Sequence, residues 1–153
     1  MKNDVVEGKK IIKNFDKIEF KNVFFKYPNT EKNVLNRINL TLNKNKKIGI
    51  VGPSGSGKST LLGLMIRLFD IHKGNIYVGK EDIKDLRLNN LRSFFSLVSQ
   101  DTVLFDGSIS ENIKYNSKLS IGSIDKFVKL ACADEIIDKL PNGLNSQIGE
   151  NGI

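Results

Sequence analysis

The residues best suited to chemistry form a glycine-rich segment with the pattern GxxxxGK[ST], in which x is any residue. It runs in the order Gly52, Pro53, Ser54, Gly55, Ser56, Gly57, Lys58, Ser59, and Thr60 follows it. The glycines let backbone N–H groups turn inward around phosphate oxygens, where a Cβ atom would obstruct them. Lys58 is expected to reach the β- and γ-phosphates of a nucleotide, Ser59 to coordinate Mg²⁺, and Thr60 to donate to the α-phosphate. The segment therefore predicts a phosphate loop.

The segments on either side fit the elements that such a loop requires. Residues 48–51 are wholly apolar, which is typical of a short strand buried in a parallel sheet. From Lys58 to about Phe69 apolar residues recur at helical spacing, and the dipole of that helix would add positive potential at the phosphates. Strand, loop and helix thus follow in the expected order.

Alternation of apolar and polar residues predicts further strands. They cover residues 18–27, with an irregularity near Asn22, and then 38–42 and 76–78. Pro28 and Asn29 end the first strand, and residues 43–46 form a turn after the second. The apolar residues 94–98 predict another strand that ends at Gln100.

Two helices are expected towards the end of the chain. Ser108 and Glu111 have the spacing of a capping box, in which each side chain satisfies a backbone donor of the first turn. Ser123 would cap a longer helix that is stopped at residues 141–143. The residues of this helix expected to face the core are Ile124, Phe127, Val128, Ala131 and Leu140.

Composition narrows the class of protein. The 153 residues are 39% apolar and 27% charged, which fits one soluble globular domain or a large piece of one. The net charge of +7 comes from scattered residues, mostly lysine, so no nucleic-acid partner is expected.

Cys132 has no second cysteine to pair with and is expected to be a small buried residue. No apolar run approaches the roughly 20 residues that span a bilayer, so a membrane role would need a partner or another segment.

Across about residues 15 to 153 the sequence resembles the ATP-binding domains of ABC transporters. The residues that carry the resemblance are 23–28, 52–60, 74–76, 97–101 and 148–152. It implies an α/β fold: a P-loop NTPase core sheet, an antiparallel β subdomain and the start of an α-helical subdomain. Residues 1–17 would be a polar leader, and 18–153 the N-terminal part of the ATP-binding domain.

The resemblance also implies roles for single residues, with ATP and Mg²⁺ as the cofactors. Tyr27 matches an aromatic residue that stacks on adenine, although a core or strand-edge tyrosine is the alternative. Gln100 matches a residue that contacts Mg²⁺ or the attacking water and links the site to a membrane domain; a solvated glutamine is the alternative. Lys58 and Gln100 are thus the candidate catalytic residues, and Ser59 and Gln100 the candidate metal ligands.

Residues 102–113, 142–145 and 148–152 resemble the exporter branch, which includes lipid flippases and multidrug pumps. In that branch the segment around Glu150 touches the intracellular ends of the membrane helices, whereas the alternative is an ordinary surface loop. The implied partners are a second ATP-binding domain, joined across two ATP molecules, and a transmembrane domain. The implied location is the cytoplasmic face of the (inner) membrane.

Hydrolysis requires groups that these 153 residues lack. An acidic pair that ends a buried strand, a γ-phosphate-sensing histidine and the LSGGQ signature are absent, and His72 has the setting of a surface residue. The chain is therefore expected to bind ATP without efficient turnover, and to be poorly soluble or partly unfolded alone, because missing core strands would expose apolar edges. A soluble P-loop kinase or GTPase, and an inert or non-catalytic remnant of a transporter gene, are the remaining alternatives.

Overall fold

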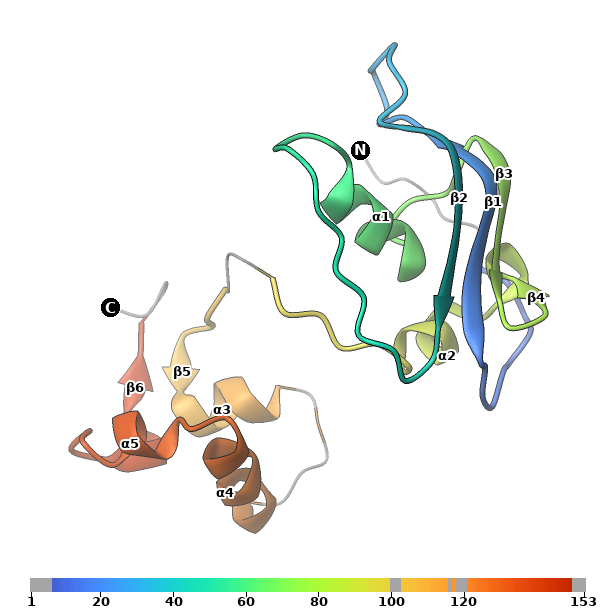
Figure 1. Ribbon diagram of the computed structural model, residues 1–153. Helices are drawn as coiled ribbons and strands as arrows, with labels where there is room; N and C mark the ends of the chain where they lie inside the picture. Colours follow the sequence, from blue (N-terminus) through green and yellow to red (C-terminus); the bar gives the residue numbers. More distant parts are fainter. Residues whose placement is uncertain (1–6, 100–102, 116, 118–120, 150–153) are drawn as a thin grey trace. The chain divides into compact units, whose positions relative to one another are not determined.

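The computed structural model describes residues 7–99, 103–115, 117 and 121–149 (Figure 1). The chain divides into two compact units, residues 1–97 and residues 98–153. The first unit contains the predicted phosphate loop and an antiparallel sheet, and the regular elements of the second unit are mainly helical among the described residues.

The sheet of the first unit has four strands in the order β2-β1-β3-β4, and every neighbouring pair is antiparallel. Alternating apolar residues predict the three long strands, and the structure confirms them. Their bounds are Lys17–Phe25 for β1, Leu35–Asn43 for β2, Lys73–Val78 for β3 and Glu81–Asp82 for β4.

The irregularity predicted near Asn22 is a bulge in β1. Asn22 has a φ of 50°, and the pairing of β1 with β2 shifts register between Phe20 and Val23. The extra residue resets the alternation, so that Phe20 and Val23 both face the core although they are three positions apart. Gly74 of β3, with a φ of 90°, lies directly against the backbone of this bulge.

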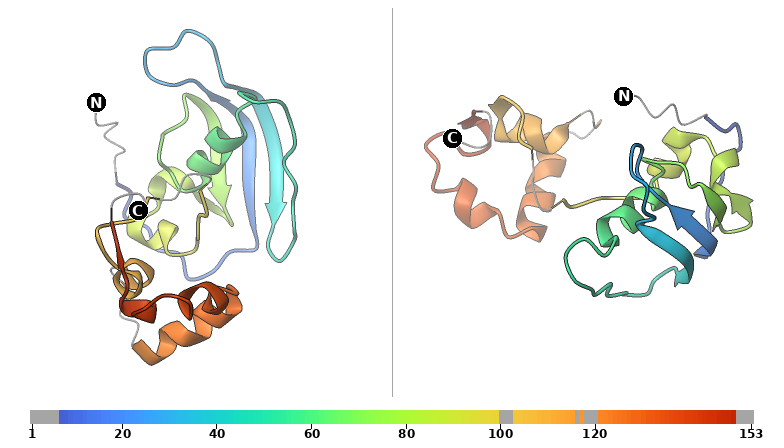
Figure 2. Two further views of the ribbon diagram at one scale, coloured as in Figure 1. Left: turned by 90° about the vertical axis from the view of Figure 1, so that its left-hand side faces the viewer. Right: turned by 90° about the horizontal axis from the view of Figure 1, so that it is seen from above.

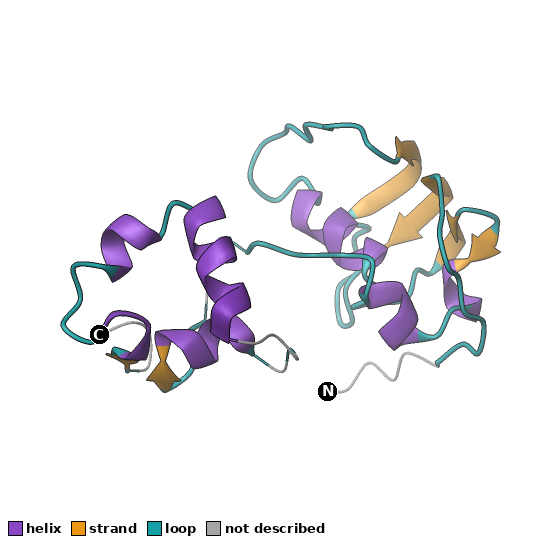
Figure 3. Cartoon of the chain, turned by 90° about the horizontal axis from the view of Figure 1, so that it is seen from below, coloured by secondary structure: helices purple, strands orange, loops and turns teal. Residues whose placement is uncertain are grey.

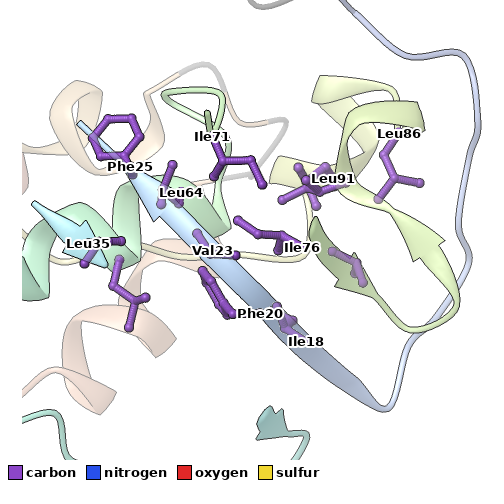
Figure 4. Close-up of a cluster of buried hydrophobic side chains, with 13 residues drawn as sticks. Ile18, Phe20, Val23, Phe25, Leu35, Leu64, Ile71, Ile76, Leu86 and Leu91 are labelled. Carbon is purple, nitrogen blue, oxygen red and sulfur yellow. The ribbon is translucent and has the colours of Figure 1, made fainter. Parts of the chain in front are cut away.

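Helix α1, Lys58–Met65, packs on the inner face of this sheet (Figures 1 and 2). Figure 4 shows the core between them, to which the 3-10 helix η1, Ile83–Asp85, and the helix α2, Leu88–Arg92, also contribute. The buried side chains are Ile18, Phe20, Val23, Phe25, Leu35, Leu61, Leu64, Ile71, Ile76, Val78, Ile83, Leu86 and Leu91.

Helix α1 is shorter than the predicted helix, which continued to Phe69. The chain turns at Arg67, which has a left-handed φ of 51° and is 2% exposed. Its guanidinium donates to the Asp70 carboxylate at 2.8 Å and to the carbonyl oxygen of Lys84 at 3.0 Å. The turn is thus stabilised by a buried cation, and this is why the apolar spacing of 58–69 overestimates the helix.

Two predicted core strands are not formed. Residues 48–51 and 94–98 run as loops, and Val51 and Val98 are 94% and 92% exposed. An apolar run becomes a strand only when a neighbouring backbone satisfies its N–H and C=O groups. No such neighbour lies beside either run among the described residues, so this part of the predicted P-loop core sheet is absent from the described structure.

Among the described residues of the second unit there are four short helical segments and one strand pair (Figures 1 and 3). Ile124, Val128 and Ile137 form its small apolar core. The helical segments are α3, Ile109–Lys114; α4, Ile121–Leu130; α5, Asp134–Ile137; and the 3-10 helix η2, Gly143–Asn145. The strands β5, Gly107–Ser108, and β6, Gln147–Ile148, pair antiparallel.

The single helix predicted from Ser123 to residue 140 is wrong, because the chain breaks it between α4 and α5. Cys132 lies at the break with a left-handed φ of 53° and is exposed, so its predicted burial is also wrong. The break lets Val128 and Ile137 face one core, which a continuous helix of this length would not allow. Phe127, Ala131 and Leu140, predicted to face the core, are on the surface. Ser123, the predicted cap, lies inside α4, which begins at Ile121.

The capping box at the start of α3 is confirmed. The Ser108 hydroxyl accepts from the backbone N–H of Glu111 at 3.2 Å, and the Glu111 carboxylate accepts from the backbone N–H of Ser108 at 2.7 Å. The carboxylate also accepts from the Ser108 hydroxyl at 2.8 Å. These bonds, the backbone bond first, hold the pKa of Glu111 below its usual value.

The variant Glu111→Gln tests this capping box through pH. A carboxyl whose pKa is lowered by folding stabilises the fold above its unfolded pKa of about 4.3, and that contribution is lost as pH falls through the folded pKa. We therefore expect thermal unfolding to show the wild type as more stable than Glu111→Gln at pH 7, and the difference to vanish at pH values below both pKa values. Asp125→Asn, at an exposed position of α4, is the control. A stability difference between the wild type and Glu111→Gln that persists at acid pH would contradict the stabilising role of the Glu111 carboxylate.

Candidate functional site

The predicted phosphate loop, residues 52–57, leads directly into helix α1, whose first residue is Lys58. Gly55 and Gly57 have left-handed φ values of 77° and 92°. At Gly57 a Cβ atom would also lie 2.8 Å from the Leu35 side chain. Both features explain why glycine is required before the helix, whose free N–H groups and dipole make its first turn suited to phosphate.

The ammonium group of Lys58 is held over the loop. It donates to the carbonyl oxygens of Gly52 at 2.9 Å and Pro53 at 2.8 Å, and lies 3.5 Å from the Ser56 hydroxyl. A positive charge and the glycine-rich backbone are therefore brought to one place. A cation beside backbone N–H groups suits a phosphate group, and the predicted contact of Lys58 with the β- and γ-phosphates stays a prediction.

Ser59 and Thr60 occupy the first turn of α1 with different surroundings. Ser59 is exposed, whereas Thr60 is 5% exposed. An exposed hydroxyl beside bound phosphates is a suitable Mg²⁺ ligand, because Mg²⁺ usually keeps several waters and takes few protein ligands. No group of three or more His, Cys, Asp or Glu residues that could hold a metal occurs in the described part of the chain.

Tyr27 lies beside the start of α1. Its hydroxyl is 2.8 Å from the Thr60 hydroxyl, within hydrogen-bond distance. Its ring meets those of Phe25 and Phe69 nearly at right angles, with centroids 5.0 and 5.3 Å away. The structure thus brings the proposed adenine-stacking residue to the helix that follows the phosphate loop, and its stacking role stays a prediction.

The aromatic neighbours of Tyr27 were not predicted from the sequence. The sequence predicts Phe69 at the end of a helix and His72 in a polar turn at the surface. His72 is exposed, but its ring lies 5.9 Å from that of Phe25, and its Nδ1 is 3.5 Å from the backbone N–H of Lys26. The three-residue spacing of Phe69 and His72 is the only local indication that both rings lie on one side of the chain. It can be interpreted only when the turn at Arg67, which ends the helix, is known.

Two sequence-predicted positions lie outside the described residues. These are Gln100, the candidate catalytic residue and metal ligand, and Glu150, in the segment expected to touch a membrane domain. Their roles stay predictions. The other candidate residues, Tyr27 and Gly52 to Thr60, are all in the first unit.

Comparison with known proteins gives one consistent result. The sequence profile of the ABC transporter family matches residues 35–151. The ATP-dependent lipid A-core flippases of Photorhabdus laumondii and Dechloromonas aromatica are 41% and 43% identical to this chain over 138 residues. Those matches cover 89% of this chain and 24% of each flippase, so the chain spans about a quarter of the length of these relatives.

Two further similarities extend beyond the flippases. The ABC transporter B family member 29, chloroplastic, of Arabidopsis thaliana is 40% identical over 138 residues, which cover 88% of this chain and 22% of that protein. A solved bacterial Atm1-family ABC exporter with ATP bound matches with a TM-score of 0.87 and 32% identity, over 96% of this chain and 26% of that one. This likeness confirms the predicted fold class. In the described part of the chain, no helix is long and apolar enough to cross a membrane.

Proposed function

Because this chain belongs to the ABC transporter family, we propose that it binds Mg-ATP as part of the ATP-binding domain of a membrane exporter. The observation that carries the proposal is the phosphate loop itself. Its left-handed glycines, the Lys58 ammonium and the first turn of α1 converge on one place. The sequence similarity extends through this loop and over most of the chain.

Each residue of the site has a separate task in this proposal. Lys58 transfers its hydrogen bonds from the loop carbonyls to the β- and γ-phosphates, which are stronger, charged acceptors. Ser59 would hold Mg²⁺, whose charge would offset that of the phosphate oxygens. Thr60 donates to the α-phosphate, and the face of Tyr27 stacks on adenine.

The partners and location belong to the longer assembly. We propose a second ATP-binding domain across two ATP molecules, a transmembrane domain that meets the segment around Glu150, and a place at the cytoplasmic face of the membrane. In that assembly Gln100 contacts Mg²⁺ or the attacking water. The acidic pair that follows an apolar run, Asp134 and Glu135, begins helix α5 and does not end a buried strand. Without an acidic pair at the end of such a strand, we expect this chain alone to bind ATP with no useful turnover.

The variant Tyr27→Ala tests adenine binding. Stacking of a base on an aromatic ring contributes about 1–3 kcal/mol, so we expect the dissociation constant for Mg-ATP to rise about 10-fold. Binding of Mg-tripolyphosphate, which has no base, should be unchanged. Isothermal titration calorimetry with both ligands measures the two effects.

Tyr115→Ala removes an exposed tyrosine of the second unit and is the matched control. It should bind both ligands as the wild type does. Failure of the wild type to bind Mg-ATP would overturn the proposed function. Equal ATP affinity in Tyr27→Ala and the wild type would overturn only the stacking role.

A further inference from the structure

We propose that Thr60 is a positioning residue for the adenine ring, because its hydroxyl fixes the Tyr27 ring on which the base stacks. This inference rests on the proposed function and extends it. It assigns Thr60 a task in base recognition in addition to its contact with phosphate. The first turn of α1 then contributes both to the phosphate-binding part and to the base-binding part of the nucleotide site.

Of the two residues joined by this hydrogen bond, Thr60 is the more rigidly held. Thr60 is 5% exposed and lies in the first turn of α1, whose inner residues Leu61 and Leu64 are packed in the core. Its oxygen is 2.8 Å from the Tyr27 oxygen. Tyr27, in contrast, follows the end of β1 and precedes a turn at residues 28–29, so its position is not set by strand pairing.

The surrounding aromatic rings restrict the orientation of the Tyr27 ring, and the hydrogen bond to Thr60 stabilises that orientation. Phe25 and Phe69 meet the Tyr27 ring at 83° and 88°, so both are edge-to-face neighbours. Phe25 is 1% exposed and belongs to the main core, which gives the cluster a fixed base. These contacts limit rotation of the ring, and the hydroxyl bond holds its far end.

A ring that is already fixed binds a base at lower entropic cost than a mobile one. Preorganisation of this kind increases affinity without adding a contact to the ligand. Loss of the hydroxyl should therefore weaken binding of the base even though the ring that touches it is retained. A residue with a purely structural role would not change affinity for the base and the phosphates unequally.

The two tasks of Thr60 are chemically compatible. A threonine hydroxyl has one proton to donate and two lone pairs to accept with. If Tyr27 donates to Thr60, the proton of Thr60 is available for the α-phosphate, and the two bonds form a chain from the ring to the phosphate. Hydrogen bonds in such a chain polarise and strengthen one another.

The test compares binding of Mg-ATP and Mg-tripolyphosphate by four proteins: the wild type, Tyr27→Phe, Thr60→Val and the double variant. The ratio of the two association constants measures the contribution of the nucleoside. We expect this ratio to fall about three- to tenfold in Tyr27→Phe, the range of one neutral hydrogen bond. Thr60→Val should lower the ratio by a similar factor, and the double variant should lower it no further.

Thr60→Ser retains the hydroxyl and is the conservative control, so its ratio should equal that of the wild type. An unchanged ratio in Tyr27→Phe would overturn the inference. A Thr60→Val variant that weakens both ligands by the same factor would also overturn it, because Thr60 would then serve phosphate alone. In both cases binding of Mg-ATP by the wild type would leave the proposed function standing; a wild type that binds no Mg-ATP would overturn both.

Discussion

Replacing Lys58 by alanine is expected to weaken Mg-ATP binding by this chain about 100-fold or more, because two charge-assisted hydrogen bonds to phosphate are lost. Each bond of this kind contributes about 1.5–3 kcal/mol, against about 1 kcal/mol for a neutral one. The Lys58 ammonium now bonds two loop carbonyls, which are neutral acceptors, so the exchange for phosphate favours binding. Isothermal titration with Mg-ATP measures the loss.

Lys47→Ala is the matched control for this experiment. It removes the same side chain and the same charge at an exposed position five residues before the loop. Long-range attraction between the positive chain and ATP falls equally in both variants, so only the local contribution of Lys58 distinguishes them. Equal affinities in the two variants would contradict the proposed site.

Phosphate release in the same samples tests the second part of the proposal. Neither the wild type nor Lys58→Ala should release phosphate at a useful rate, since the 153 residues lack the acidic pair that such hydrolysis uses. Turnover by the wild type that Lys58→Ala abolishes would reveal an unrecognised catalytic carboxylate. A kinase or GTPase activity would then have to be tested.

The variant Gly74→Ala is expected to lower the free energy of unfolding by at least about 3 kcal/mol. Gly74 has a φ of 90°, which alone strains any residue with a Cβ atom. The added Cβ would also overlap the backbone carbonyl oxygens of Lys21 and Asn22 in the β1 bulge. Backbone atoms of a paired strand cannot move aside without breaking the β1–β3 pairing, so the loss should be large.

Urea denaturation of the chain followed by circular dichroism measures this effect. Gly49→Ala is the control, because a Cβ atom at Gly49 would meet nothing within 4 Å. That variant should unfold at the midpoint of the wild type or slightly above it. Retention of full stability by Gly74→Ala would show that the bulge at Asn22 has a different register.

The strands of the antiparallel sheet were predictable because their signal is local, whereas their antiparallel pairing was implied only by the family resemblance. Ile18 and Phe20 before the bulge, and Val23 and Phe25 after it, show both the alternation and the shift, and Asn22 is a residue that tolerates a positive φ. The capping box was predictable for the same reason. Its donors and acceptors lie within four residues of sequence.

The wrong predictions concern segments whose structure depends on contacts with residues that are distant in the sequence. Residues 48–51 and 94–98 have the composition of strands, but strand formation depends on a neighbouring backbone that their own sequence does not supply. Cys132 continues an apolar helical pattern, yet the packing of Val128 with Ile137 requires a turn there. The phosphate loop has a local signal in its glycine and lysine spacing, whereas the bond from Tyr27 to Thr60 joins residues 33 positions apart and has none.

The two ends of α1 are held differently, and this predicts how the site responds when a ligand arrives. Arg67, two residues after the end of α1, donates to the carbonyl oxygens of Ile83 and Lys84 and to Asp70, whereas the first turn of α1 follows the open loop and is bonded to Tyr27 through Thr60. A short helix that is held in this way is expected to keep its position when the neighbouring loop moves. We therefore expect rearrangement around phosphate in residues 48–57 and in the Lys58 side chain, and we expect the occupied site to affect the sheet only by adding stability.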